Sequence, residues 1–351
     1  MSLPALQRLR EARPEAHIAL LTPVKLSELW KPPLIDEVIG FESDESLGSV
    51  VRKLRAGQFA IGIVLPMSFR SALEFWLAGI PTRVGTEHKG REAFLSHPVR
   101  KPAGIPEMKK RTVKEILRVT EAVDPIKPDA FPLMSHHVYR YLNLVAALGA
   151  DPTPAAPRLT IEAAEAEEVR DRFFPGRPRI APRWMGMCPG AEYGLAKRWP
   201  EERFVEAACR LHRQTGCEWL LFGGQADRAT CERISAAIGA RTAPKAANNL
   251  AGLTSLRELA ALLHSCSVVI GNDSGPMHCA AAVGAPVSVV FSSTSAGLTG
   301  QGLPGSADNS LLTSSAPCSP CFLPTCPIDM RCMNSLTVER MVQSVLDLLP
   351  E

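Results

Sequence analysis

The segment Gly271–His278 contains residue types that can bind a phosphate group and a sugar. The apolar run Val268–Ile270 before it is typical of a buried parallel strand, and the small residues Cys279–Val283 after it predict a helix. A turn between a strand and a helix offers backbone N–H groups and the positive end of the helix dipole to an anion. Asp273 and His278 add polar groups that suit a ribose or another sugar.

A simpler interpretation of this segment is a capped turn without a ligand. Asp273 or Ser274 would then only accept hydrogen bonds from the first backbone N–H groups of the helix. Because short motifs often arise by chance, the spacing alone leaves both interpretations open.

Three further loops stand at the ends of predicted strands or helices, namely residues 189–200, 222–227 and 249–256. Gly190 allows close approach of a ligand to the backbone, and Lys197 adds a positive charge. Gln225 and Thr254 are the polar candidates in the other two loops. In open α/β sheets ligands bind where strands end and helices begin, so together the four loops predict a nucleotide-sized site.

The elements that must position these residues alternate between strand and helix along the chain. Strands are predicted near residues 17–21, 35–41, 59–65, 183–188, 218–222, 268–270 and 287–291. Helices are predicted near residues 3–10, 25–30, 47–56, 69–77, 112–120, 135–148, 161–173, 200–214, 279–283 and 338–349. This alternation predicts an α/β fold with parallel sheets. The Pro-rich stretch 151–157 reads as a linker between domains 1–157 and 158–351, with a ligand cleft between them.

Composition excludes several classes of protein. The chain has 351 residues, of which 46% are hydrophobic and 21% charged, as in a soluble globular protein. No apolar run approaches the ~20 residues of a membrane-spanning helix, and the first residues do not resemble a secretory signal. We therefore expect a cytoplasmic protein. The net charge of +3 is too small to indicate a nucleic-acid partner.

Basic residues are concentrated between Arg83 and Arg118, where ten Lys or Arg face four Glu. The ten are Arg83, Lys89, Arg91, Arg100, Lys101, Lys109, Lys110, Arg111, Lys114 and Arg118. Such a cluster suits an anionic acceptor or an anionic membrane surface, and a solvated helix face is the equally simple alternative.

Four cysteines, Cys318, Cys321, Cys326 and Cys332, form the densest group among the ten in the chain. Four thiolates so close in sequence can bind zinc or an iron–sulfur cluster, although the spacing differs from that of common zinc ribbons. Reduced structural thiols are the other interpretation, and we expect no metal and no cofactor.

The order of these loops resembles the ADP-heptose:lipopolysaccharide heptosyltransferases of glycosyltransferase family nine. The resemblance depends on Pro189-Gly-Ala with Lys197-Arg-Trp-Pro, Leu221-Phe-Gly, Asn249-Leu-Ala-Gly-x-Thr-Ser-Leu, and Asn272-Asp-Ser-Gly-x-Met-His. In the first half it depends on Leu65-Pro-x-Ser-Phe-Arg-Ser-Ala and Ala78-Gly-Ile-Pro-x-Arg-x-Gly. It spans nearly the whole chain and is strongest to the heptosyltransferase II subfamily.

This resemblance implies a GT-B fold, in which two Rossmann-like domains bind the acceptor and the donor respectively. It implies that the last helix, 338–349, packs back toward the N-terminal domain. The implied donor-binding residues are Gly190, Lys197 at the diphosphate, Gln225 at the ribose, Thr254 at the adenine, and Asp273, Ser274, Gly275 and His278 at the diphosphate and sugar. The implied acceptor-binding residues are Ser68, Arg70 and Arg83.

The implied reaction is inverting transfer of heptose from ADP-heptose to the inner core of lipopolysaccharide, at the cytoplasmic face of the inner membrane. Two alternatives remain open at this point. One is a family transferase with another sugar or acceptor, and the other is a nucleotide-sugar-binding protein without catalysis.

The resemblance also implies a buried strand and a Gly-Asp loop ahead of the helix that here begins near Met1–Pro4. The aspartate of that loop would be the general base, so the base is missing from the chain as given. We expect a slot in the first sheet, because the first strand of a Rossmann order is central. A start codon assigned too late explains this better than a degraded copy, because the donor loops are intact.

Overall fold

The computed structural model describes residues 1–88, 90–101, 105–106, 108–121, 131–177, 183–304 and 306–350. The chain divides into two compact units. The first unit contains Met1–Pro106 and Met134–Ala156, and the second contains Glu107–Leu133 and Pro157–Glu351. Strand pairing is parallel in both units, which confirms the predicted α/β class.

The second unit is built on a six-stranded sheet with the order β11-β10-β9-β6-β7-β8. Its strands are β6 (Trp184–Cys188), β7 (Glu218–Leu221), β8 (Ala247–Asn249), β9 (Val268–Asn272), β10 (Val287–Phe291) and β11 (Asn309–Thr313). Its α-helices are α4 (Val113–Glu121), α6 (Ala163–Phe173), α7 (Glu201–Thr215), α8 (Arg228–Arg241), α9 (Leu256–His264), α10 (Gly275–Ala282), α11 (Ala296–Thr299), α12 (Arg331–Asn334) and α13 (Val338–Leu348). Two 3₁₀ turns, η4 (Leu195–Lys197) and η5 (Gln225–Asp227), follow β6 and β7.

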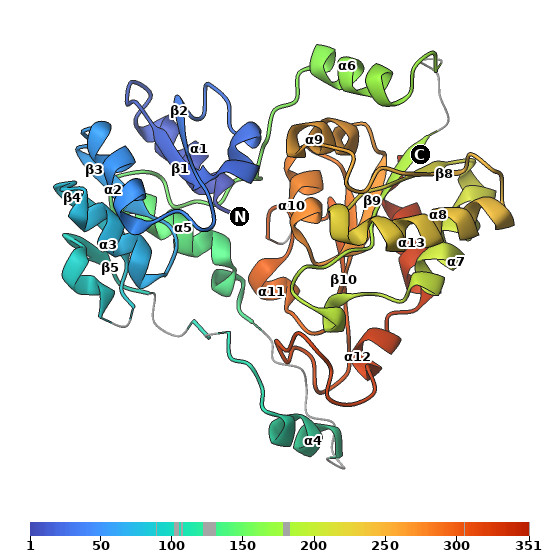
Figure 1. Ribbon diagram of the computed structural model, residues 1–351. Helices are drawn as coiled ribbons and strands as arrows, with labels where there is room; N and C mark the ends of the chain where they lie inside the picture. Colours follow the sequence, from blue (N-terminus) through green and yellow to red (C-terminus); the bar gives the residue numbers. More distant parts are fainter. Residues whose placement is uncertain are drawn as a thin grey trace. The chain divides into compact units, whose positions relative to one another are not determined.

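The three central strands β6, β9 and β10 are buried along their whole length, as expected for a parallel sheet covered on both faces. Helices α7, α8 and α13 lie to one side of the sheet, while α9 and α10 lie to the other (Figure 1). The core between sheet and helices includes Trp199, Phe204 and Trp219. α13 packs on α7 and on β9 to β11.

The first unit contains two short parallel sheets, with the orders β1-β2 and β3-β4-β5. Their strands are β1 (Ala19–Pro23), β2 (Glu37–Phe41), β3 (Ile61–Val64), β4 (Thr82–Thr86) and β5 (His97–Val99). The α-helices are α1 (Leu3–Ala12), α2 (Leu47–Ala56), α3 (Phe69–Leu77) and α5 (His137–Ala146), with 3₁₀ turns η1 (Val24–Leu29), η2 (Arg91–Phe94) and η3 (Leu133–Ser135), the last spanning the boundary of the two units.

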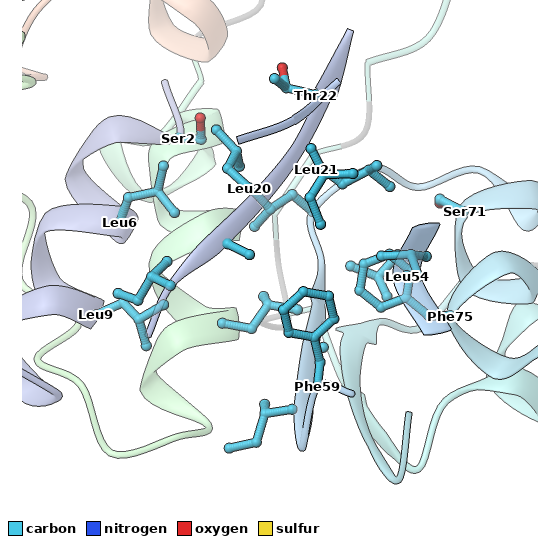
Figure 2. Close-up of a pocket in the computed structure, with 18 of the residues that line it drawn as sticks. Ser2, Leu6, Leu9, Leu20, Leu21, Thr22, Leu54, Phe59, Ser71 and Phe75 are labelled. Carbon is cyan, nitrogen blue, oxygen red and sulfur yellow. The ribbon is translucent and has the colours of Figure 1, made fainter. Parts of the chain in front are cut away.

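An apolar cavity of about 580 Å³, which we call the β1–β3 cavity, lies in this unit (Figure 2). Residues of β1, β3 and α1 line it, so it lies where the two sheets are interrupted.

The predicted elements recur with small shifts at their ends, and residues 25–30 form a 3₁₀ turn rather than an α-helix. Four strands were missing from the prediction, namely β4, β5, β8 and β11. The segment Glu107–Leu133 precedes the Pro-rich stretch in sequence but belongs to the second unit. Among the described residues, no helix combines the length and the apolar character needed to cross a membrane.

Candidate functional site

The four predicted loops of the second unit follow strands of one parallel sheet, so they lie at its carboxyl edge. The loop of residues 189–200, here called the Lys197 loop, follows β6. Gln225 follows β7, Thr254 follows β8, and Asp273–His278 follows β9. β6 lies between β7 and β9 in the sheet, so the Lys197 loop lies between the loop that carries Gln225 and the segment Asp273–His278.

Lys197 and Asp273 form the electrostatic centre of this edge. The Lys197 Nζ atom lies 2.6 Å from Asp273 Oδ2, and the two side chains are only 12% and 6% exposed. Thr294 donates a hydrogen bond of 2.8 Å to the same oxygen, and Gln301 Nε2 donates one of 3.3 Å to Oδ1. The ring of Tyr193 lies 5.5 Å from Lys197 Nζ, in cation–π range. The structure therefore brings together the two charges that the sequence predicted for one site.

Asn272, the last residue of β9, fixes the Lys197 loop to the sheet. Its side-chain oxygen accepts a hydrogen bond from the Trp199 backbone N–H at 2.9 Å, and its Nδ2 donates to the Pro189 carbonyl at 2.6 Å. Ser292 Oγ donates to the Ala196 carbonyl at 2.8 Å. Because these bonds are buried, the position of Lys197 is set by the sheet rather than by solvent.

The N-terminus of α10 has no side-chain cap. Ser274 is the N-cap residue but makes no capping hydrogen bond. The Asp273 carboxylate pairs with Lys197 and accepts hydrogen bonds from Thr294 and Gln301. The capped-turn interpretation is therefore wrong for these two side chains. The Ser274 hydroxyl oxygen is buried without a partner, as is that of Ser293 at the end of β10. A helix N-terminus with adjacent unpaired hydroxyls suits a phosphate group.

Glycines bring the neighbouring loops close together. A Cβ atom on Gly190 would lie 2.5 Å from the Asp227 carboxylate, so that side chain fits only against glycine. Gly252 has a φ of +73°, and its Cα faces the exposed side chain of Gln225. Gln225 and the loop that carries Thr254 are thus adjacent, as a shared nucleoside-binding role requires.

The cysteine-containing segment 316–332, here called the Cys318 loop, supports the Lys197 loop from outside. The Pro324 carbonyl accepts a hydrogen bond from the Ala196 backbone N–H at 2.9 Å. Tyr193 donates its hydroxyl hydrogen to the Phe322 carbonyl at 2.7 Å, and Phe322 N–H donates to Ser293 O at 2.7 Å. The Cys318 loop therefore contacts both the Lys197 loop and the residues that follow β10.

The cysteines themselves pack as apolar groups. All ten thiols are free, and Cys318, Cys321 and Cys332 form a buried cluster with Ile116 and Val119 of α4. A hydrogen bond with the Cys332 thiol lowers the pKa of Cys318 to about 7 and raises that of Cys332. Within the described residues, no three His, Cys, Asp or Glu side chains are arranged to hold a metal ion.

The three predicted acceptor residues lie in the first unit. Ser68 is the N-cap of α3 and accepts a hydrogen bond from Ser71 N–H at 3.1 Å. Arg70 is exposed, and its Nε lies 2.7 Å from Glu74 Oε1. The Arg83 guanidinium donates to the carbonyls of Phe94, Ile80 and Pro81, so it ties β4 to its surroundings. Of the three, Arg70 has the most accessible charge.

The basic segment does not form a single exposed cluster among the described residues; Lys89 lies outside them. The unit boundary divides it after Pro106. Arg91 is buried and donates to the Pro66 carbonyl at 2.6 Å, and Arg111 donates to the Pro317 carbonyl at 2.9 Å. With Arg83, three of the ten basic residues therefore hold backbone carbonyls in place.

Thr294 and Gln301 belong to the site but were not predicted. Thr294 follows β10 directly, in Ser292-Ser293-Thr294, so the strand-end rule that identified Asp273 would also have identified it. Gln301 lies in an irregular stretch after α11, where no periodicity or motif marks it.

The comparisons with known proteins agree with this geometry. A family model described as "Glycosyltransferase family 9 (heptosyltransferase)" matches residues 47–122 and 122–331. The chain belongs to glycosyltransferase family 9. It is therefore a heptosyltransferase-type glycosyltransferase, and the predictions of family and enzyme class are confirmed.

Among family relatives, lipopolysaccharide heptosyltransferase 2 of Escherichia coli K12 is 30% identical over 316 residues, covering 84% of this chain and 80% of the relative. Lipooligosaccharide heptosyltransferase 2 of Haemophilus influenzae is 33% identical over 239 residues, covering 68% and 62%. The solved structure of the E. coli ADP-heptose heptosyltransferase II matches with a TM-score of 0.74 at 25% identity, covering 99% of this chain and 93% of that one. E. coli heptosyltransferase WaaC, solved with ADP-2-deoxy-2-fluoro heptose, shares the fold at a TM-score of 0.63 and 16% identity, covering 99% of this chain and 94% of that one.

Proposed function

We propose that this family 9 enzyme transfers heptose from ADP-heptose to a heptose of the lipopolysaccharide inner core, with inversion at the anomeric carbon. The observation that carries the proposal is the buried Lys197–Asp273 pair beside the uncapped N-terminus of α10. The relatives named for lipopolysaccharide heptosyltransferase 2, and the WaaC structure with an ADP-heptose analogue, support the choice of donor and acceptor class.

In this proposal the diphosphate lies against the α10 N-terminus. The backbone N–H groups at Gly275 and the Ser274 hydroxyl donate to the phosphate oxygens, and Lys197 supplies the neutralising charge. Asp273 then orients Lys197 and accepts from a sugar hydroxyl, with His278 one helical turn further along α10. Gln225 and Thr254 hold the ribose and the adenine, and Gly190, within the Lys197 loop, leaves room for the Asp227 carboxylate.

The chemical step follows from these positions. An acceptor hydroxyl attacks the anomeric carbon from the face opposite the diphosphate, and the bond between that carbon and the β-phosphate oxygen breaks. The hydroxyl proton passes to a carboxylate base, to which we assign no described residue. ADP leaves with the bonding electron pair, and Lys197 with the α10 amides stabilises its negative charge. The acceptor side of the proposal places Ser68, Arg70 and Arg83 at the acceptor, of which Arg70 best suits an anionic core sugar.

Thermal melting with ADP, ADP-heptose and UDP-sugars tests the donor. A ligand at 100 times its Kd adds about 2.7 kcal/mol of stability when it binds only the folded state. We expect the melting temperature to rise with ADP and ADP-heptose and to stay unchanged with UDP-sugars. Stabilisation by UDP-sugars alone would show that the enzyme uses another donor.

The second test uses Asp273→Ala. We expect weaker ADP-heptose binding in calorimetry, because Lys197 loses the group that orients it and the sugar loses an acceptor. Asp308→Ala, at a carboxylate outside the site, is the control. Undiminished affinity for Asp273→Ala would remove Asp273 from donor binding. Mass analysis of heptose-truncated core oligosaccharide incubated with ADP-heptose then tests the acceptor.

A further inference from the structure

Two cysteine side chains of the Cys318 loop are in contact with each other. Cys318 lies between β11 and α12, and Cys332 lies in α12. The Cys332 thiol donates a hydrogen bond to the Cys318 sulfur, and neither cysteine is part of a disulfide. Two sulfur atoms at hydrogen-bond distance need to approach by on the order of 1–2 Å to reach the S–S bond length of ~2.05 Å. The pair is therefore arranged for cross-linking.

Cys318 also differs from other thiols of the second unit in its ionisation. The hydrogen bond from Cys332 lowers the pKa of Cys318 to about 7, so a large share of this thiol is ionised at neutral pH. Burial instead raises the pKa of the thiols of Cys188, Cys217, Cys231, Cys266 and Cys279. Because the thiolate is the reactive form, an oxidant reacts with Cys318 before it reacts with those five thiols.

The surroundings of the pair limit the size of the oxidant. Cys318 and Cys332 are 5% and 6% exposed, and they form an apolar cluster with Ile116 and Val119 of α4. Oxidised glutathione and other bulky disulfides are too large to reach sulfur atoms that are buried in this way. Hydrogen peroxide has only two heavy atoms and reaches them through small local openings of the loop. The burial of the pair therefore favours a small hydroperoxide as the reactant.

The segment between the two cysteines carries the contacts with the Lys197 loop. The Phe322 carbonyl accepts from the Tyr193 hydroxyl, and the Pro324 carbonyl accepts from the Ala196 N–H. Phe322 and Met330 have φ values of +56° and +58°, and they are two of the three non-glycine residues with positive φ in the described part of the chain. Such conformations persist only while surrounding contacts hold them. Drawing the two ends of this segment together therefore shifts the carbonyls that hold the Lys197 loop.

We propose that Cys318 and Cys332 form a modification site, at which a small hydroperoxide produces a reversible disulfide that displaces the Cys318 loop from the Lys197 loop and lowers transferase activity. The cross-link and the displacement are independent of the proposed function, and only the loss of activity rests on it.

The reaction has two steps. The Cys318 thiolate attacks one oxygen of hydrogen peroxide, an S–O bond forms, and the O–O bond breaks. Hydroxide leaves with the bonding electron pair and takes up a proton, which gives water and a sulfenic acid on Cys318. The Cys332 sulfur then attacks the Cys318 sulfur, the S–S bond forms, and the S–O bond breaks. A second water leaves with the Cys332 proton, so two thiols are oxidised and one peroxide is reduced to two waters.

Treatment of the full chain with hydrogen peroxide, followed by peptide mass analysis without reduction, tests the cross-link. We expect a peptide pair joined through Cys318 and Cys332, lighter by two hydrogen atoms than the separate peptides and separated again by dithiothreitol. Cys318→Ser and Cys332→Ser should each abolish the pair. Cys326→Ser, at a partly exposed cysteine of the same loop, is the matched control and should retain it.

Hydrogen exchange at the Ala196 amide measures the displacement, because this N–H is bonded to the Pro324 carbonyl. We expect oxidation to accelerate its exchange by about tenfold and to lower kcat with ADP-heptose by about tenfold or more. Dithiothreitol should reverse both changes, and Cys318→Ser should show neither. If the reduced protein does not turn over ADP-heptose, the proposed function fails, while the peptide pair and the exchange at Ala196 still decide this inference.

Three results would overturn the proposal. The first is peroxide-treated protein in which both thiols remain free, or in which Cys318 is joined to Cys326 instead of Cys332. The second is a Cys318–Cys332 disulfide that leaves exchange at Ala196 and kcat unchanged. The third is one equivalent of bound metal in protein purified without chelator that peroxide releases, since the thiols would then be metal ligands.

Discussion

Lys197 is held by a carboxylate, an aromatic ring and a rigid loop, so its charge is already oriented before any phosphate reaches it. Preorganised charge of this kind stabilises a transition state more than a mobile side chain does. We expect Lys197→Ala to lower kcat with ADP-heptose by roughly 3 kcal/mol of transition-state stabilisation, or about a hundredfold. Steady-state kinetics measures the loss.

Lys245→Ala provides the matched control for this substitution, because Lys245 is an exposed lysine of the same unit away from the four loops. Its kcat should equal that of the unmodified protein. Turnover by Lys197→Ala at the level of this control would show that Lys197 does not act on the leaving diphosphate.

Candidate site residues could be predicted to lie together where they follow a strand with a distinct motif. Asp273 and Lys197 stand in Gly- and Pro-rich turns after apolar runs, and the structure brings them into contact. Gln301 could not be predicted, because its contact with Asp273 depends on the path of an irregular segment. Arg83 was interpreted by its charge, whereas its bonds to backbone carbonyls depend on tertiary structure.

Among the elements, the Lys197 loop depends on contact with the Cys318 loop at Gly194. Gly194 has a φ of +152°, and a Cβ atom there would collide with the Pro324 carbonyl. We expect Gly194→Ala to push the two loops apart, to lower stability by about 1–3 kcal/mol, and to reduce kcat together with donor affinity. Urea denaturation and kinetics measure the two effects.

The variant Gly284→Ala measures the effect of backbone strain without a collision like the one between Gly194 and Pro324. Gly284 also has a positive φ, +87°, but a Cβ atom there meets nothing within 4 Å. It should destabilise the protein by about 1 kcal/mol and leave kcat unchanged. If Gly194→Ala reduces kcat no more than Gly284→Ala does, the Cys318 loop does not position the Lys197 loop.

At the scale of elements, long apolar or amphipathic segments were predictable and short polar strands were not. β9 is Val-Val-Ile-Gly-Asn and β10 is Val-Ser-Val-Val-Phe, and burial on both faces explains why most of their side chains are apolar. β4 is Thr-Arg-Val-Gly-Thr, which has a single apolar side chain, and β8 is Ala-Asn-Asn, whose asparagines are uncommon in strands, so neither shows an apolar run. They form strands because they pair with neighbouring strands, β4 with β3 and β5, and β8 with β7. That pairing depends on tertiary structure and cannot be read from the segment alone.

The stability of the whole molecule should depend on pH through His137, near the start of α5. Burial, with Arg140 and His136 nearby, lowers the pKa of His137 to about 4, below its ordinary 6.5. The unfolded chain therefore binds the proton more readily between pH 6.5 and 4, so stability is full above that window and falls as the pH decreases through it. Because the ring is only partly buried, we expect a loss of about 1 kcal/mol.

Urea midpoints measured from pH 7 to pH 4 test this dependence. The variant His137→Gln, which cannot take up a proton, should show a smaller decrease than the unmodified protein. His97→Gln, at an exposed histidine of the same unit, should retain the full decrease. Identical pH profiles for the unmodified protein and His137→Gln would rule out His137 as the titrating group.

The chain passes between the two units three times, after Pro106, Leu133 and Ala156. The segment Glu107–Leu133, which belongs to the second unit, includes α4. Ile116 and Val119 of α4 cover the buried thiols of the Cys318 loop. A hybrid of two family members joined once, at the Pro-rich stretch 151–157, would inherit α4 from one parent and the cysteines beneath it from the other. Evolution or engineering that exchanges the first unit between relatives must therefore use three junctions, or exchange the covering helix and the covered loop together.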